Sequence, residues 1–190
     1  MRADPAELLA LAEPLAVEVA AHLRASLAGA GPAITSKSTP TDLVTELDTW
    51  AEAHITERIL AARPDDAIQG EEGADVAGTS GVTWCVDPID GTVNFVHAIP
   101  GFCVSIAAQV GGRTVAAVVA SPLHDEVFTA TLGGGAACNG SPIRCAKPTS
   151  LARSVVATGF GYDPARRTRQ AAVVTQVIGQ IADIRRFGAA

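Results

Sequence analysis

Residues 84–95 read Trp-Cys-Val-Asp-Pro-Ile-Asp-Gly-Thr-Val-Asn-Phe. The apolar residues of Val82 to Val86, which lead into this string, predict a β-strand. Asp87 and Asp90 are three residues apart across a proline, so we expect the chain to leave the strand in a fixed turn that aims both carboxylates at one point. Hard divalent cations prefer such clusters of oxygen ligands. The string therefore predicts a cation site at the end of a strand.

A second acidic segment, residues 70–73, reads Gly-Glu-Glu-Gly and also follows a predicted strand. Its Glu71 is a candidate for a third carboxylate, and Mg²⁺ usually combines one or two protein carboxylates with waters and phosphate oxygens. A helix that begins near Asp90, Gly91 and Thr92 would turn its first N–H groups toward the same place, which suits a phosphate. Together these features predict metal-assisted hydrolysis of a phosphoester. The alternative is that the two aspartates only cap a helix.

The pattern on both sides of this string predicts helices layered on a mainly antiparallel sheet. Leucine-type residues recur at helical spacing from Leu8 to Leu27 and again from Leu43 to Ile59, and a third helix is predicted over Arg166 to Ile181. Gly111-Gly112-Arg113 is typical of a hairpin turn. The predicted strands are Ala67 to Gln69, Val82 to Val86, Phe102 to Val110, Thr114 to Ser121, Glu126 to Thr131, Ser154 to Thr158 and Ile184 to Phe187.

Composition narrows the classes of protein to which the chain can belong. With 190 residues, of which 48% are hydrophobic and 18% charged, the chain is long enough for one domain with a core. Residues 1–95 hold 16 acidic and 5 basic side chains, and residues 96–190 hold 4 and 9. The acidic half argues against a nucleic-acid groove as the main function and permits a cation site. We expect a cytoplasmic protein without membrane contact, because neither a secretory leader nor a spanning segment is indicated.

The string at residues 84–95 resembles the W-x-x-DPIDGT-x-NF signature of the inositol monophosphatase family, which belongs to the lithium-sensitive, Mg²⁺-dependent phosphatases. The resemblance extends to residues 37–45 with Asp48, to residues 70–72 and to residues 185–188, in the order that the family has them. It implies an α+β fold with αβαβα layers, in which helices flank a mainly antiparallel sheet. It also implies a homodimer.

The same resemblance implies a role for each matched position. Metal ligands would come from side chains and one backbone carbonyl, the attacking water would be oriented by two residues, and backbone N–H groups would meet the phosphate. Asp48 would help the outermost metal or its waters. The predicted residues are Glu71 and Thr92 for catalysis; Glu71, Asp87, Ile89 (through its carbonyl) and Asp90 for Mg²⁺; and Glu71, Ile89, Asp90, Gly91, Thr92 and Arg185 for the substrate.

One departure from the family concerns length. Family members continue into a second signature, W-D-x-A-A-G, whose aspartate ligates a second metal, whereas this sequence stops at Ala190. We therefore expect residues 1–190 to be the amino-terminal two-thirds of a single domain, with the carboxyl-terminal layers missing.

The resemblance implies a Mg²⁺-dependent phosphomonoesterase that hydrolyses inositol 1-phosphate or a similar small polyol phosphate by attack of a metal-activated water. Three alternatives stay open. The first is a catalytically impaired, truncated member that binds a metal or a partner. The second is a related sugar or nucleotide phosphatase, because the matched motifs hold the metal and the phosphate more than the leaving group. The third is a regulatory protein that contacts RNA, which the acidic half disfavours.

Overall fold

The computed structural model describes residues 3–27, 34–36, 43–147 and 150–189 of the chain. No helix in these residues is both long and apolar enough to cross a bilayer. The helices are α1 (Pro5–Ser26), α2 (Glu46–Ala62), α3 (Thr92–Val96) and α4 (Pro164–Val177), with 3-10 turns η1 (Leu151–Arg153) and η2 (Ile178–Gln180). The strands are β1 (Ile34–Ser36), β2 (Leu43–Thr45), β3 (Ala67–Gly70), β4 (Asp75–Val76), β5 (Val82–Asp90), β6 (Cys103–Val110), β7 (Arg113–Ser121), β8 (Glu126–Thr131), β9 (Gly135–Cys138), β10 (Ser141–Ile143), β11 (Val155–Ala157) and β12 (Asp183–Arg185).

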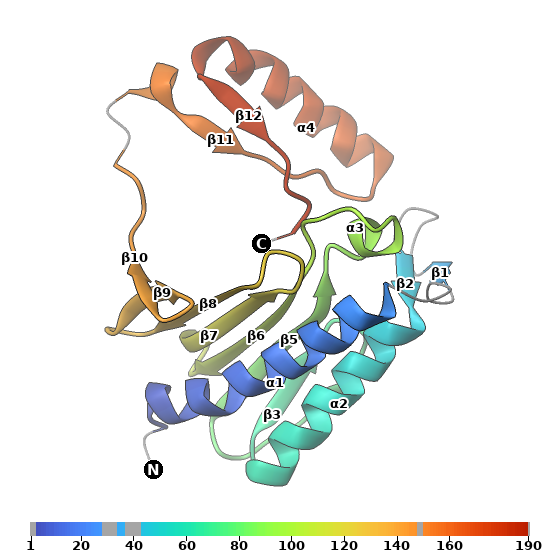
Figure 1. Cartoon of the computed structure of the whole chain (residues 1–190), viewed down its shortest axis with the longest axis vertical. Coiled ribbons are helices and arrows are strands. Elements are labelled where there is room, and N and C mark those ends of the chain that lie inside the picture. Colours follow the sequence, from blue (N-terminus) through green and yellow to red (C-terminus); the bar gives the residue numbers. More distant parts are fainter. Residues whose placement is uncertain (1–2, 28–33, 37–42, 148–149, 190) are drawn as a thin grey trace.

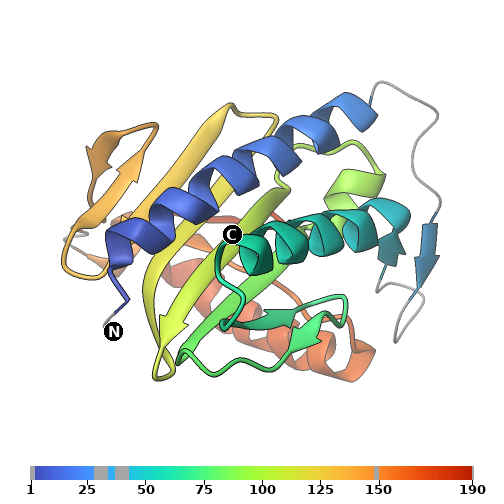
Figure 2. The same cartoon turned by 90° about the horizontal axis from the view of Figure 1, so that it is seen from below.

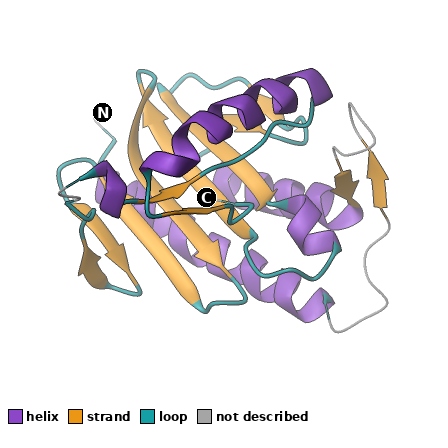
Figure 3. Ribbon diagram, turned by 90° about the horizontal axis from the view of Figure 1, so that it is seen from above, coloured by secondary structure: helices purple, strands orange, loops and turns teal. Residues whose placement is uncertain are grey.

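An eight-stranded sheet in the order β10-β9-β8-β7-β6-β5-β3-β4 forms the middle of the molecule. Its pairs are antiparallel except for β3 with β5, which run parallel. Helices α1 and α2 lie side by side on one face of this sheet (Figure 1), and α4 lies beyond the opposite face (Figure 2). A small parallel sheet of β11 and β12 accompanies α4, and Figure 3 shows both from the α4 side. The predicted α+β class, with helices flanking a mainly antiparallel sheet, is confirmed.

The core lies between the α1–α2 layer and the sheet. Helix α1 begins at Pro5, three residues before the predicted pattern starts at Leu8, because Asp4 caps it, with Oδ1 accepting the Ala6 N–H at 3.0 Å. Its buried stripe has helical spacing, and small residues in the stripe let the helix approach the strands closely. From the sheet side, Trp84, Phe95 and Phe102 are fully buried, and the last two rings meet edge to face at 5.0 Å. The buried residues of α1 are Leu8, Ala12, Leu15, Ala16, Val19, Ala20 and Leu23.

The second predicted helix begins three residues later than its apolar pattern suggests. Leu43 to Thr45 forms β2, which pairs antiparallel with β1, and α2 starts only at Glu46. The reason is a capping box: Thr45 adopts an extended backbone and accepts the Asp48 N–H, while Asp48 Oδ2 accepts the Thr45 N–H at 2.8 Å. Glu46 and Asp48 give α2 an acidic first turn, which the helix dipole favours. Residues 37–42, which carry part of the family resemblance, lie outside the described residues.

Other boundaries shift in the carboxyl-terminal part. The hairpin of β6 and β7 turns at Gly111 and Gly112, both with positive φ, as the turn sequence predicts. Two short strands, β9 and β10, form where no strand is predicted, because the hairpin there extends the sheet edge beyond β8. The predicted helix over Arg166 to Ile181 is α4, which begins earlier because Asp163 accepts the Arg166 N–H at 2.7 Å. It ends earlier, at Val177, where the chain tightens into η2.

Candidate active site

Strand β5 does not end at Asp87. The predicted turn after this residue is wrong, because β5 continues to Asp90 and contains a register shift against β6. Asp87 pairs with Ser105 and Asp90 pairs with Cys103, so two residues of β5 lie opposite one of β6. This is a β-bulge, and it contains the proline, which has no N–H to give to the ladder.

The bulge decides where the two aspartates point. Residues three apart in a regular strand lie on opposite faces of the sheet. Ser105 and Cys103 are two apart and share a face, so the extra residue in the bulge brings Asp87 and Asp90 to that same face. The other face of β5 carries the buried Trp84 and Ile89. Both carboxylates therefore lie on the face turned away from α1 and α2, as the predicted metal site requires.

The segment after β5 forms the predicted helix start. Gly91 has φ +89° and serves as the N-cap of α3, which begins at Thr92. A Cβ at Gly91 would lie 2.9 Å from the Gly101 carbonyl oxygen, so only glycine fits here without displacing backbone. The Thr92 hydroxyl lies 2.9 Å from the Ile89 carbonyl oxygen and 3.3 Å from Asp48 Oδ1. The hydroxyl of Thr92 is thus held between β5 and α2.

Glu71 reaches the site from the neighbouring strand. Its N–H donates to the Val86 carbonyl oxygen at 3.1 Å, which ties the loop after β3 to β5 immediately before Asp87. Burial, the charge of Glu71 and a hydrogen bond with Glu71 raise the pKa of Asp87 to about 8. The negative charges of Asp90 and Asp48 also contribute to this rise. Three carboxyl groups from three separate segments of the chain, those of Glu71, Asp90 and Asp48, therefore converge on Asp87.

A cation would relieve this arrangement. Asp87 Oδ1 is one of two buried side-chain oxygens in the described residues that have no hydrogen-bond partner. A buried carboxylate oxygen without a partner is costly, and the like charges around it add to the cost. Carboxylate oxygens are the ligands that hard divalent ions prefer, so the residues fit such an ion. Within the described parts of the chain, no three His, Cys, Asp or Glu side chains already stand at ligand distance from one centre.

Two of the cavities on this face of the sheet are lined by the carboxyl groups of the site. One, of about 440 Å³, is lined by Glu71 and Asp87 together with Ser105. The other, of about 420 Å³, is lined by Asp90 and by the segment that contains Arg186. The predicted substrate residue Arg185 does not line either cavity among the described residues; its guanidinium instead pairs with Asp183 and donates to the Ile184 carbonyl oxygen at 2.8 Å. Arg186, its neighbour, is the arginine that the structure places beside Asp90.

Asn94 is a site residue to which sequence reasoning gave no role. Its side chain is buried, and Nδ2 donates to the carbonyl oxygens of Gly101 at 2.7 Å and Phe187 at 2.9 Å. Gly188 packs against the same amide so closely that a Cβ there would lie 2.3 Å from Nδ2. Asn94 thereby joins α3 to the carboxyl-terminal segment that contains Arg186. The signal was its place inside the conspicuous string at residues 84–95.

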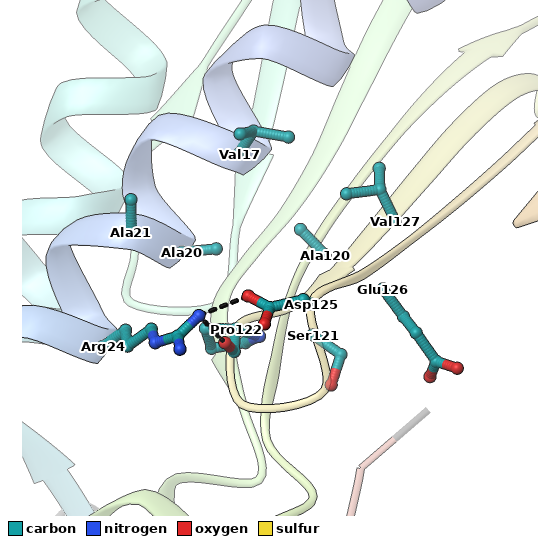
Figure 4. A pocket seen from close by; sticks show the side chains of 10 residues that line it. All are labelled: Val17, Ala20, Ala21, Arg24, Ala120, Ser121, Pro122, Asp125, Glu126 and Val127. Carbon is teal, nitrogen blue, oxygen red and sulfur yellow. Dashed lines mark hydrogen bonds and ion pairs between the residues drawn. The ribbon is translucent and has the colours of Figure 1, made fainter. Parts of the chain in front are cut away.

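A further cavity, of about 270 Å³, lies between α1 and the turn from β7 to β8 (Figure 4). Its walls are mostly alanine, valine and proline side chains. At its edge the Arg24 guanidinium hydrogen-bonds Asp125 and the Pro122 carbonyl oxygen, so these charges satisfy each other. It contains none of the carboxyl groups that gather around Asp87, and the chemistry therefore lies on the opposite face of the sheet.

Known proteins resemble this chain over most of its length. The model of the inositol monophosphatase family matches residues 4–190. An inositol-1-monophosphatase of Mycobacterium bovis is 43% identical over 205 residues, which cover 98% of this chain and 71% of the relative. The Nus factor SuhB of Escherichia coli K12 is 40% identical over 151 residues, covering 78% of this chain and 57% of that protein.

Solved structures also share the fold of this chain. The crystal structure of the extragenic suppressor protein SuhB from Bartonella henselae superposes with a TM-score of 0.89 at 33% identity, over 97% of this chain and 71% of that one. Proteins that match to this extent in both sequence and structure descend from a common ancestor. The chain belongs to the inositol monophosphatase family.

Proposed function

We propose that the protein is a Mg²⁺-dependent phosphomonoesterase that acts on inositol 1-phosphate or a similar small polyol phosphate. Family membership supports a phosphatase, and the relative from Mycobacterium bovis carries the name inositol-1-monophosphatase. The single observation that carries the proposal is the convergence of Glu71, Asp90 and Asp48 on Asp87, whose buried Oδ1 lacks a partner. A divalent cation is the group that such a set of oxygens would hold.

The residues of the chain divide the work as follows. Glu71, Asp87 and Asp90 would hold Mg²⁺, with the Ile89 carbonyl oxygen beside them. When bound, Mg²⁺ supplies positive charge that eases the loss of a proton from water and stabilises the leaving oxygen. Glu71 and Thr92 would orient the attacking water by accepting its protons or donating to its oxygen.

The phosphate would lie at the start of α3. Backbone N–H groups at Gly91 and Thr92 would donate to its oxygens, and the close backbone packing at Gly91 keeps these groups in place. Asp48 would hold the Thr92 hydroxyl in the orientation that the water requires, since the two side chains lie 3.3 Å apart. The cavity beside Asp90 and Arg186, of about 420 Å³, would receive the polyol.

The test is phosphate release from inositol 1-phosphate by the purified chain, with Mg²⁺ and with a chelator. We expect release only with Mg²⁺, inhibition by Li⁺, and a loss of at least about 100-fold in the Asp90→Asn variant. The exposed Asp75, on the short edge strand β4, provides the control variant Asp75→Asn, which keeps full activity. Full activity of Asp90→Asn would contradict the assignment. The predicted homodimer and cytoplasmic location stay predictions.

A second candidate function is regulatory contact with RNA. Two observations favour it: one relative carries the name Nus factor SuhB, and residues 96–190 hold 9 basic against 4 acidic side chains. Three of these basic residues, Arg166, Arg167 and Arg169, lie on α4, which has no buried residue. Binding of single-stranded RNA that weakens steeply with salt would support this function. No binding at low salt would exclude it.

A further inference from the structure

A buried carboxylate on α2 faces the loop that carries Glu71. Glu52 is only 3% exposed, although it lies on a helix at the edge of the molecule. Its Oε2 accepts the Glu72 N–H at 2.7 Å, and its Oε1 accepts the Ala74 N–H at 2.8 Å. Both oxygens are therefore used to hold the backbone of one loop. Charge-assisted hydrogen bonds of this kind are roughly twice as strong as neutral ones.

The loop is built around this carboxylate. The Gly70 N–H donates to the Ala74 carbonyl oxygen at 3.2 Å, which closes the turn. Gly73 has φ +103°, a conformation that favours glycine. A Cβ at Gly70 would lie 2.2 Å from Oε2 of Glu52, so glycine at this position leaves the space that the carboxylate fills. Any side chain at residue 70 would push the carboxylate away from the N–H groups it accepts.

Glu71 lies between two fixed points of the backbone. Its own N–H donates to the Val86 carbonyl oxygen of β5, and the N–H of the next residue, Glu72, donates to Glu52. The peptide that carries the Glu71 side chain is thereby held on one side by the sheet and on the other by α2. The side chain itself is exposed, so packing does not fix it. Its approach to Asp87 depends on these backbone contacts.

We propose that Glu52 is a positioning residue: it holds residues 70–74 so that the Glu71 carboxylate is presented to Asp87 and to the metal. The proposal rests on the proposed function for the part that concerns the metal. Asp48 lies one helical turn before Glu52 on the same face of α2 and contacts the Thr92 hydroxyl. Helix α2 therefore holds both predicted catalytic residues. Asp48 contacts the Thr92 hydroxyl, and Glu52 holds the loop that carries Glu71.

The test uses the full chain and the variant Glu52→Gln, which keeps the shape of the side chain but replaces one acceptor oxygen with an amide group. One loop N–H then loses its acceptor. The exposed Glu57, on the same helix, gives the matched control Glu57→Gln. Hydrogen exchange of residues 70–74 without metal is the first readout. We expect exchange at least about 10-fold faster in Glu52→Gln, with no change elsewhere in the chain and none in the control.

The second readout is the affinity for Mg²⁺, measured by titration calorimetry. Replacing residues that orient metal ligands typically costs about 10- to 100-fold in affinity, and we expect a loss in this range for Glu52→Gln. If Glu52 acts through Glu71, the loss disappears when the same change is made in a Glu71→Gln background. An equal loss in both backgrounds, or unchanged exchange of residues 70–74, would overturn the proposal. A general loss of stability would lower the melting temperature without this dependence on Glu71.

A second variant keeps the proposal testable if Glu52→Gln does not fold. Gly70→Ala leaves Glu52 intact but places a methyl group against its carboxylate, so it should also speed exchange of the loop and weaken Mg²⁺ binding. Gly179→Ala, in η2, where a Cβ meets no atom within 4 Å and φ is not positive, is the control for a glycine replacement. Failure of the wild-type chain to bind Mg²⁺ would refute the proposed function, while the exchange measurement would still decide whether Glu52 holds the loop.

Discussion

The variant Asp87→Asn should make the metal-free protein more stable while it removes a metal ligand. Burial and the charge of Glu71 raise the pKa of Asp87 to about 8 from an ordinary 3.8, so the folded protein resists ionisation of this group. Asparagine has nearly the same shape and does not ionise. Its amide can still donate to Glu71, as the protonated Asp87 does.

The size of the effect follows from the shift. Each pKa unit corresponds to about 1.36 kcal/mol, and at pH 7 the penalty spans about three units, which gives a ceiling of about 4 kcal/mol. Water that enters the open site screens part of this penalty, and we expect about 2 kcal/mol, or a rise in melting temperature of about 4–8 °C. Because the folded pKa of Asp87 lies above the unfolded value, the contribution of Asp87 to wild-type stability is complete below pH 3.8 and is lost as the pH rises toward 8.

The assay is urea unfolding of both proteins with a chelator at about pH 5, 6, 7 and 8. The advantage of Asp87→Asn should grow across this series, and saturating Mg²⁺ should reduce it because only the wild type keeps the ligand. The exposed Asp65 gives the control Asp65→Asn, which removes one negative charge from the same half of the chain. Equal stability of wild type and Asp87→Asn at pH 8 without metal would refute the reasoning.

Three other predictions concern residues of the core and of the site. Asp66→Ala should cost about 3 kcal/mol in urea unfolding, because Asp66 accepts the Trp84 Nε1–H at 2.9 Å. Burial opposes ionisation of Asp66, but its hydrogen bonds outweigh this effect and hold its pKa below 3.8. The contribution of Asp66 to wild-type stability should therefore be lost as the pH drops below about 4. A similar loss in Asp66→Ala would contradict this reasoning. Gly91→Ala, at φ +89° and against the Gly101 carbonyl oxygen, should cost about 2 kcal/mol and lower kcat at least about 10-fold; unchanged kcat would argue against a role of this backbone in phosphate binding. Phe95→Ala should cost about 3–5 kcal/mol by calorimetry, and a cost below about 1 kcal/mol would place the ring outside the core.

The spacing of apolar residues was sufficient to predict the elements whose side chains face the core at regular intervals. Helix α1 and the hairpin of β6 and β7 follow directly from leucine spacing and from a glycine pair. It was insufficient where a local hydrogen bond decides a boundary. Leu43 continues the apolar pattern of α2, yet the helix starts only at Glu46. The reason is the capping box, in which Thr45 and Asp48 exchange hydrogen bonds.

Glu52 shows a signal that the sequence holds but that pattern reading passes over. It lies four residues after Asp48 and three before Ile55, on the stripe of α2 that is buried. An acidic residue in an apolar stripe predicts that its carboxylate has N–H or cationic partners inside the protein. Which partners these are depends on a loop 20 residues away, and no spacing rule specifies it.

The sequence alone determined the composition of the site, because its acidic groups all belong to recognisable motifs: Asp87 and Asp90 in the string at residues 84–95, together with Glu71 and Asp48. It did not determine their geometry. Asp87 and Asp90 share a face of the sheet only because β6 accommodates an extra residue of β5 as a bulge. Glu71 joins them only because β3 runs parallel to β5. Such register and strand order arise from contacts between distant segments, so they appear only when the whole sheet has formed.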